Sequence, residues 1–170
     1  MSLVYLGVGS NINRESNICA GLSVLRDSFG LRRASSAYES AALGFDGPPF
    51  INLVVELQTT LPLAELAAAL RELEYRMGRP QQATRYSSRT LDLDILTYDQ
   101  LAGTIAGVEL PRAEILENAY VLAPLAELVP EAMHPVLGKC YLQLWQEFDK
   151  NAQTLEQLRF STGDWQLPFS

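Results

Sequence analysis

The chain has 170 residues, 48% of them hydrophobic, and this composition is typical of a globular protein with a buried core. Its formal net charge of −7 argues against nucleic acid as a general partner. No stretch approaches the ~20 continuous apolar residues that cross a bilayer, and no charged leader precedes the first apolar run. We therefore expect a single cytoplasmic domain over residues 1–170 with no membrane partner.

Apolar periodicity predicts alternating strands and helices along the chain. In chain order, the expected elements are a strand over 3–8, a helix over 15–28, strands over 33–38 and 50–57, a helix over 63–77, a strand over 91–98, and helices over 118–128 and 141–158. Gly78 is expected to end the second helix, since glycine favours the position after a helix C-terminus.

The predicted β-α-β-β-α-β order is that of the ferredoxin-like split β-α-β fold. We therefore expect an α+β protein in which helices pack on an antiparallel sheet. The strand over 91–98 is expected to be central, and a C-terminal helical extension is expected to follow the sheet.

Two aspartates alternate with apolar residues in the strand predicted over 91–98. Asp92 and Asp94 should point to one face of the sheet, while Leu93 points to the other. Two neighbouring carboxylates repel each other unless a cation lies between them, and hard oxygen ligands suit magnesium. Taken alone, the pair favours a solvated acidic face on an edge strand.

Arginines accumulate just before the aspartate pair. Residues 71–89 contain five arginines and two glutamates, a local excess of +3 in an acidic protein. Arg85 and Arg89 precede the pair directly, and guanidinium forks bind phosphate oxygens in a bidentate manner. Metal-binding carboxylates beside phosphate-binding arginines favour a phosphoryl-transfer site over a solvated acidic face, and a small anionic ligand over a long polyanion.

Several motifs, spaced over residues 3 to 150, together resemble one enzyme family. They are Leu6-Gly7-Val8-Gly9-Ser10-Asn11, Phe50-Ile51-Asn52, Glu74-x-x-x-Gly78-Arg79, Arg89-Thr90-Leu91-Asp92-Leu93-Asp94-Ile95, Leu110-Pro111 and Tyr120-Val121-Leu122-Ala123-Pro124-Leu125. The family that they resemble is 6-hydroxymethyl-7,8-dihydropterin pyrophosphokinase, of folate biosynthesis. This resemblance implies transfer of pyrophosphate from ATP to the primary alcohol of the pterin, with two magnesium ions. The tail over 151–170 extends beyond the resemblance and receives no role.

The resemblance divides the implied site into a metal pair, a nucleotide side and a pterin side. Asp92 and Asp94 are implied to hold both magnesium ions. Arg79 and Arg89 are implied to bind the migrating phosphates as catalytic residues, assisted by Arg85. The other implied nucleotide-side residues are Glu74, Ile95 and Arg112, and the implied pterin-side residues are Ser40, Leu43, Phe50, Asn52, Tyr86 and Tyr120, with the two tyrosines sandwiching the ring.

The nucleotide side departs from the usual pattern of that family. Arg112 stands where a histidine is usual, and Glu109 places a carboxylate near the expected triphosphate, which is electrostatically unfavourable. The other changed positions on this side are Arg71, Gln81, Gly107 and Asn118. Three functions therefore stay open: the pyrophosphokinase, a diverged paralogue with another pteridine-like substrate or donor, and a non-catalytic pterin-binding module. The aspartate pair favours an enzyme.

Overall fold

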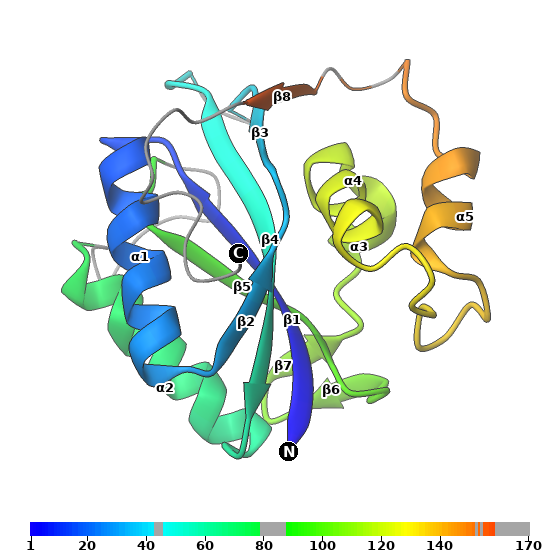
Figure 1. Cartoon of the computed structure of the whole chain (residues 1–170), viewed down its shortest axis with the longest axis horizontal. Helices are drawn as coiled ribbons and strands as arrows, with labels where there is room; N and C mark the ends of the chain where they lie inside the picture. The colour runs from blue at the N-terminus through cyan, green and yellow to red at the C-terminus, as the bar shows by residue number, and fades with distance from the viewer. Residues whose placement is uncertain (43–45, 79–87, 152, 154, 159–170) are drawn as a thin grey trace.

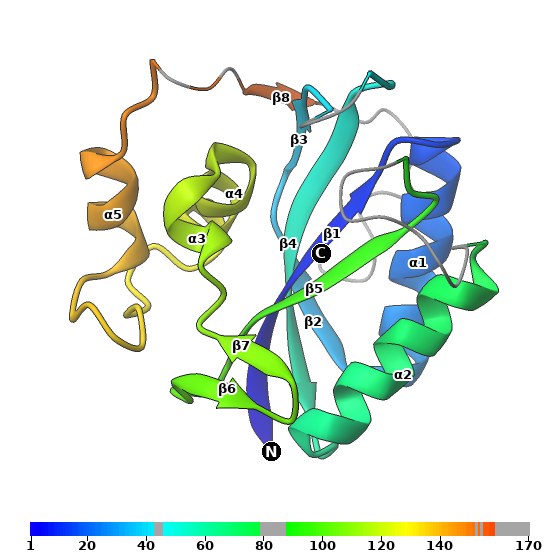
Figure 2. The ribbon, with the colours of Figure 1, turned by 180° about the vertical axis from the view of Figure 1, so that it is seen from behind.

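An antiparallel β-sheet runs through the middle of the molecule, with helices on both of its faces (Figure 1, Figure 2). The computed structural model describes residues 1–42, 46–78, 88–151, 153 and 155–158. The strands of this sheet are β1 (Ser2–Ser10), β2 (Leu31–Ala34), β3 (Ala37–Ser40), β4 (Phe50–Thr59), β5 (Asp92–Tyr98) and β8 (Glu156–Leu158). They lie in the order β5-β1-β4-β3-β8, with β2 also paired to β4, and the pairs are antiparallel.

The remaining elements are five helices and a small hairpin within the described part of the chain. They are α1 (Arg14–Ser28), α2 (Leu63–Arg76), α3 (Glu114–Glu117), α4 (Ala119–Leu128), α5 (Tyr141–Glu147), β6 (Gly103–Ile105) and β7 (Val108–Leu110). The order is β-α-β-β-β-α-β, with β2 and β3 in place of one expected strand, and with its antiparallel pairing it confirms the expected ferredoxin-like α+β fold and its C-terminal helical extension. Among the described residues, no helix has the length and apolar character needed to span a membrane.

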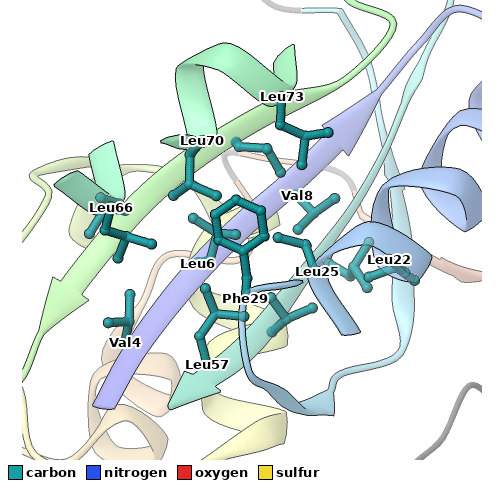
Figure 3. Packing of buried hydrophobic residues seen from close by; sticks show 14 of the residues in the cluster. Val4, Leu6, Val8, Leu22, Leu25, Phe29, Leu57, Leu66, Leu70 and Leu73 are labelled. Atoms are coloured by element: carbon teal, nitrogen blue, oxygen red, sulfur yellow. The ribbon is translucent and has the colours of Figure 1, made fainter. Parts of the chain in front are cut away.

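Two hydrophobic cores lie on opposite faces of the sheet. On one face, Leu6 of β1 packs with Leu25 of α1 and Leu70 of α2 (Figure 3). On the other face, the neighbouring residue Tyr5 belongs to a second core with Leu122 of α4. Because successive strand residues point to opposite faces, β1 contributes to both cores and is buried between two layers of helices.

The position of β5 in the sheet corrects one sequence-based expectation. This strand lies at the end of the strand order, and β1 and β4 are the central strands. The expectation of a central strand was wrong because helices cover both faces of β5. Leu93 is buried in the core beneath α1 and α2, while Leu96 is buried in the core beneath α4. Even this edge strand therefore buries apolar residues on both of its faces.

Other differences lie at element boundaries. The strand expected over 33–38 is two short strands, β2 and β3, separated at Ser35, whose backbone N–H and hydroxyl bond Val54 of β4. The helix expected over 141–158 ends at Glu147, since Phe148 is extended (φ −71°, ψ 139°), and the chain goes on to form β8. The end of α2 is as expected, because Gly78 adopts φ +106° directly after it.

Candidate active site

The two aspartates of β5 lie on the sheet face that α4 covers. Asp92 is opposite Gly9 of β1, and Asp94 is opposite Gly7. Leu93, between them, is buried on the other face, as the sequence predicted. Leu96, two residues beyond Asp94, packs in the core with α4, which fixes the face to which both carboxylates point.

The carboxylates of this pair disfavour each other's charge. Partial removal of water, and then the charge of Asp92, raise the pKa of Asp94 to about 7, against the opposing effect of Arg112. A divalent cation at this position would relieve that repulsion. In the described part of the chain, no group of three or more metal-binding side chains gathers. The two carboxylates that are present suit magnesium, which is usually held by one or two carboxylates together with phosphate oxygens and water.

Arg112 lies beside Asp94. Its Nη2 is 3.5 Å from Oδ1 of Asp94 and 3.1 Å from Oε1 of Glu114. Its backbone N–H donates to the carbonyl of Leu96 at 2.9 Å, which anchors the segment between β7 and α3 to β5. A guanidinium thus sits next to the carboxylate pair, within reach of anything bound there.

Arg89 is held at the approach to the aspartates by Asn11. The backbone N–H of Arg89 donates to Oδ1 of Asn11 at 2.7 Å, and the carbonyl of Arg89 accepts from the backbone N–H of Asn11 at 3.0 Å. The Asn11 amide also donates to Oγ of Ser88 at 3.2 Å. Asn11 belongs to the first motif of the sequence, but sequence reasoning gave it no role. Its role in the structure is to fasten Arg89 to the end of β1.

Asn52 and Ser40 lie on the same face as the aspartates. Asn52 is opposite Gly9, and Gly9 is in turn opposite Asp92, so the three residues form one row across β4, β1 and β5. The Asn52 amide donates to the hydroxyl of Ser40 at 2.7 Å. A Cβ at Gly9 would lie 3.0 Å from Oδ1 of Asn52, so a side chain at this position would press on the Asn52 amide. Phe50, opposite Ser40, is half-buried.

Tyr120 approaches this face from α4. Its side chain packs against the core that contains Val54, two residues along β4 from Asn52. Its hydroxyl accepts a hydrogen bond of 2.9 Å from the amide of Asn118. Asn118, a changed position on the expected nucleotide side, therefore holds the ring expected on the pterin side.

Ile95 lies on β5 itself, and Glu74 contacts β5 from α2. The Ile95 side chain is buried in the core with α1 and α2, on the face opposite the aspartates, which leaves its backbone as the part that can meet a nucleotide. Glu74 is buried on α2, and its Oε2 accepts the backbone N–H of Leu93 at 2.8 Å. Arg71 pairs with the other oxygen of Glu74 at 3.3 Å. Glu74 therefore holds the edge strand between its two aspartates.

Four expected site residues and one changed position lie outside the described residues: Leu43, Arg79, Arg85, Tyr86 and Gln81. The β6–β7 hairpin carries two further changed positions. Gly107 forms its turn with φ +76°, and the side chain of Glu109 is exposed on β7.

Comparisons with known proteins place the chain in one family. The model of the family described as 7,8-dihydro-6-hydroxymethylpterin-pyrophosphokinase (HPPK) matches residues 5–130. The 2-amino-4-hydroxy-6-hydroxymethyldihydropteridine pyrophosphokinase of Aquifex aeolicus is 30% identical over 141 residues, which are 82% of this chain and 88% of that protein. The protein of the same name from Synechocystis is 33% identical over 150 residues, 86% of this chain and 76% of that protein.

A solved structure agrees on the fold. The HPPK-DHPS protein of Plasmodium falciparum, solved with pteroate, superposes with a TM-score of 0.69 at 14% identity. The match covers 86% of this chain but only 42% of that longer chain, and at this identity it speaks for the fold alone. Together with the family match over residues 5–130, it leads to one conclusion: the chain belongs to the 7,8-dihydro-6-hydroxymethylpterin pyrophosphokinase family and is an enzyme, an ATP-dependent pyrophosphokinase.

Proposed function

We propose that this chain transfers pyrophosphate from ATP to the hydroxymethyl group of 6-hydroxymethyl-7,8-dihydropterin, with two magnesium ions held at Asp92 and Asp94. The observation that carries the proposal is the row Asp92–Gly9–Asn52 on one face of the sheet. It sets a carboxylate pair suited to metal ions and an amide suited to a heterocycle on either side of a glycine, where a side chain would press on that amide. The family membership supports the same chemistry.

The carboxylates of Asp92 and Asp94 supply hard oxygen ligands on one face of β5. Bound magnesium would contribute neutralisation of the triphosphate and alignment of the acceptor hydroxyl. The edge of β5 at this point is fixed by the bond from Leu93 to Glu74, so the two carboxylates keep their spacing. The protein's contribution to phosphoryl transfer is mainly positioning and charge stabilisation.

One arginine side chain contacts the pair, and the backbone of a second arginine is held near it. Arg112 lies against Asp94, and Arg89 is fastened through Asn11 to the end of β1, adjacent to Asp92 along the sheet. Both can bind phosphate oxygens as charge develops during transfer. We assign Arg79 and Arg85 to the same task by resemblance. Glu109, the change least compatible with a triphosphate, has an exposed side chain.

The pterin would lie over Gly9, between Asn52 and the aspartates. The bond to Ser40 fixes the amide of Asn52, so that its carbonyl oxygen stands over Gly9 as an acceptor for the N–H groups of a heterocycle. The ring of Tyr120, on the same face, would stack on the heterocycle. We assign Leu43, Phe50 and Tyr86 to this side by resemblance.

A calorimetric titration, first with a non-hydrolysable ATP analogue and magnesium and then with the hydroxymethyl dihydropterin, tests the proposal. We expect saturable, magnesium-dependent nucleotide binding that strengthens pterin binding, and release of AMP when ATP replaces the analogue. Pterin binding without nucleotide binding would instead identify a non-catalytic module. AMP release with another pteridine alcohol, but not with this one, would identify a diverged paralogue.

A further inference from the structure

The chain beyond residue 130, where the family match ends, contacts the junction of α3 and α4 through Gln153. The Oε1 atom of Gln153 accepts the backbone N–H of Ala119 at 2.8 Å, and its Nε2 donates to the carbonyl of Glu117 at 2.7 Å. One side-chain amide thus bonds the backbone on both sides of Asn118. The family match ends at residue 130, so this clamp is outside it.

Asn118, the residue enclosed by this clamp, joins α3 to α4. Its backbone is extended (φ −119°, ψ 121°), and its carbonyl accepts from the N–H groups of Val121 and Leu122, both at 3.0 Å. Its side-chain amide donates to the hydroxyl of Tyr120 at 2.9 Å. A short chain of hydrogen bonds therefore runs from Gln153, through the backbone at Asn118, to the ring of Tyr120.

The same segment is also paired with β3, the strand that carries Ser40 of the expected pterin side. Strand β8 pairs with β3 (Figure 1), and Glu156 is opposite Glu39, the residue before Ser40. Ser40 is the partner of Asn52. Gln153 and Glu156 are three positions apart in the chain, and an extended chain of that length spans at most about 10 Å. The segment therefore ties the start of α4 to the end of β3 over a short distance.

We propose that Gln153 is a positioning residue for the pterin site: it fixes Asn118, and through Asn118 it sets the ring of Tyr120 opposite Asn52. The inference rests on the proposed function, because it takes Tyr120 as the stacking residue. Without the clamp, the α3–α4 junction loses a partner for the N–H of Ala119 and the carbonyl of Glu117, and the ring of Tyr120 becomes less restricted before it meets its ligand.

The test uses Gln153→Ala in the full chain. We expect hydroxymethyl dihydropterin, titrated in the presence of magnesium and a non-hydrolysable ATP analogue, to bind about tenfold more weakly, the effect of about one net hydrogen bond. KM for the pterin should rise by a similar factor, while kcat and the affinity for the ATP analogue stay near wild type. Gln143→Ala is the matched control, since the Gln143 amide bonds only Glu147 on the exposed side of α5 among the described contacts.

A double-mutant cycle with Tyr120→Phe separates this role from a general structural one. Tyr120→Phe keeps the ring but removes the hydroxyl that Asn118 holds. If Gln153 acts through this bond, the two losses in pterin affinity will be clearly less than additive. Additive losses, or wild-type pterin affinity in Gln153→Ala, would overturn the inference.

Two further measurements keep the outcome unambiguous. Hydrogen exchange at the Ala119 amide should be faster in Gln153→Ala, because that amide loses its acceptor; unchanged exchange would contradict the clamp itself. Gln153→Glu keeps that acceptor but faces the Glu117 carbonyl with a second acceptor, so its pterin affinity should not recover to wild type. If the wild-type protein binds no pterin, the proposed function is refuted. If the wild-type protein binds pterin and Gln153→Ala binds it with the same affinity, only this inference is refuted.

Discussion

Arg112 and Asp94 form an ion pair, with Nη2 of the arginine 3.5 Å from Oδ1 of the aspartate. The same Nη2 lies 3.1 Å from Oε1 of Glu114, so the guanidinium is shared between two carboxylates. Its positive charge lowers the pKa of Asp94 against the opposing effects of desolvation and Asp92. Under the proposed function, Arg112 would turn from Asp94 towards a phosphate once a metal ion bound at Asp94, while Glu114 remained its second partner.

Replacing Arg112 by alanine should weaken binding of the magnesium complex of an ATP analogue. The expected loss is about 1.5–3 kcal/mol, the range for a hydrogen bond to a charged group. Pterin affinity measured without nucleotide should barely change, because Asn52 and Tyr120 do not contact this arginine in the contacts described. Calorimetry with each ligand separately checks both statements.

The control for this substitution is Arg26→Ala, which removes an exposed arginine paired with Asp27 on α1. It should leave both affinities unchanged. Equal nucleotide affinity in Arg112→Ala and wild type would remove Arg112 from the nucleotide side and leave its ion pairs as surface contacts of little energetic weight.

Substitution of either site aspartate by asparagine should abolish transfer without loss of cooperative unfolding. Asparagine keeps the shape of the side chain but removes the charge that a magnesium ligand needs. In Asp92→Asn and Asp94→Asn, product formation tests the loss of transfer, and denaturant unfolding tests whether the fold stays cooperative. Asp27→Asn on α1 is the matched control. Transfer that survives in both single variants would rule out the metal assignment.

The stability of the metal-free protein should fall as the pH rises from about 4 to about 7. The pKa of Asp94 is raised from its ordinary 3.8 to about 7, so between these values the folded protein binds a proton that the unfolded chain does not. Raising the pH removes that proton and leaves two repelling carboxylates, after which this group contributes no further pH dependence.

Thermal unfolding in a chelator, and again with excess magnesium, tests this dependence. The increase in Tm on adding magnesium should be larger at pH 8 than at pH 5.5, because only the ionised pair binds the ion. In Asp94→Asn the fall in Tm with rising pH should become shallower. A magnesium effect that is equal at both pH values would contradict the coupling between the proton and the metal.

The features that the sequence predicted correctly have local causes. Asp92 and Asp94 share a face because strand side chains alternate, and α2 ends before Gly78 because glycine tolerates a positive φ. The edge position of β5 depends on which strands pair, and the bond from Gln153 to Ala119 joins residues 34 apart. No local pattern carries such information.

The roles of the site residues stay predictions, and the structure adds contacts that the sequence did not predict. The resemblance named Asn52 and Ser40, which the structure brings together, but it gave Glu74 to the nucleotide. The structure shows that the Glu74 carboxylate bonds the backbone of Leu93, 19 residues away. A buried carboxylate that accepts a backbone N–H of an edge strand and one that binds a ligand look alike in sequence. Only variants can separate the two roles.

Glu74→Ala and Glu74→Gln make that separation. Alanine leaves the N–H of Leu93 without its acceptor, and we expect a loss of about 1–3 kcal/mol in the free energy of unfolding, the usual cost of an unsatisfied buried donor. Glutamine keeps an acceptor oxygen, and the partner that it releases, Arg71, is half exposed and stays solvated. Glu74→Gln should therefore unfold at nearly the wild-type denaturant concentration and keep its affinity for the ATP analogue. Wild-type stability combined with lost nucleotide affinity in Glu74→Gln would show instead that this carboxylate acts on the nucleotide directly.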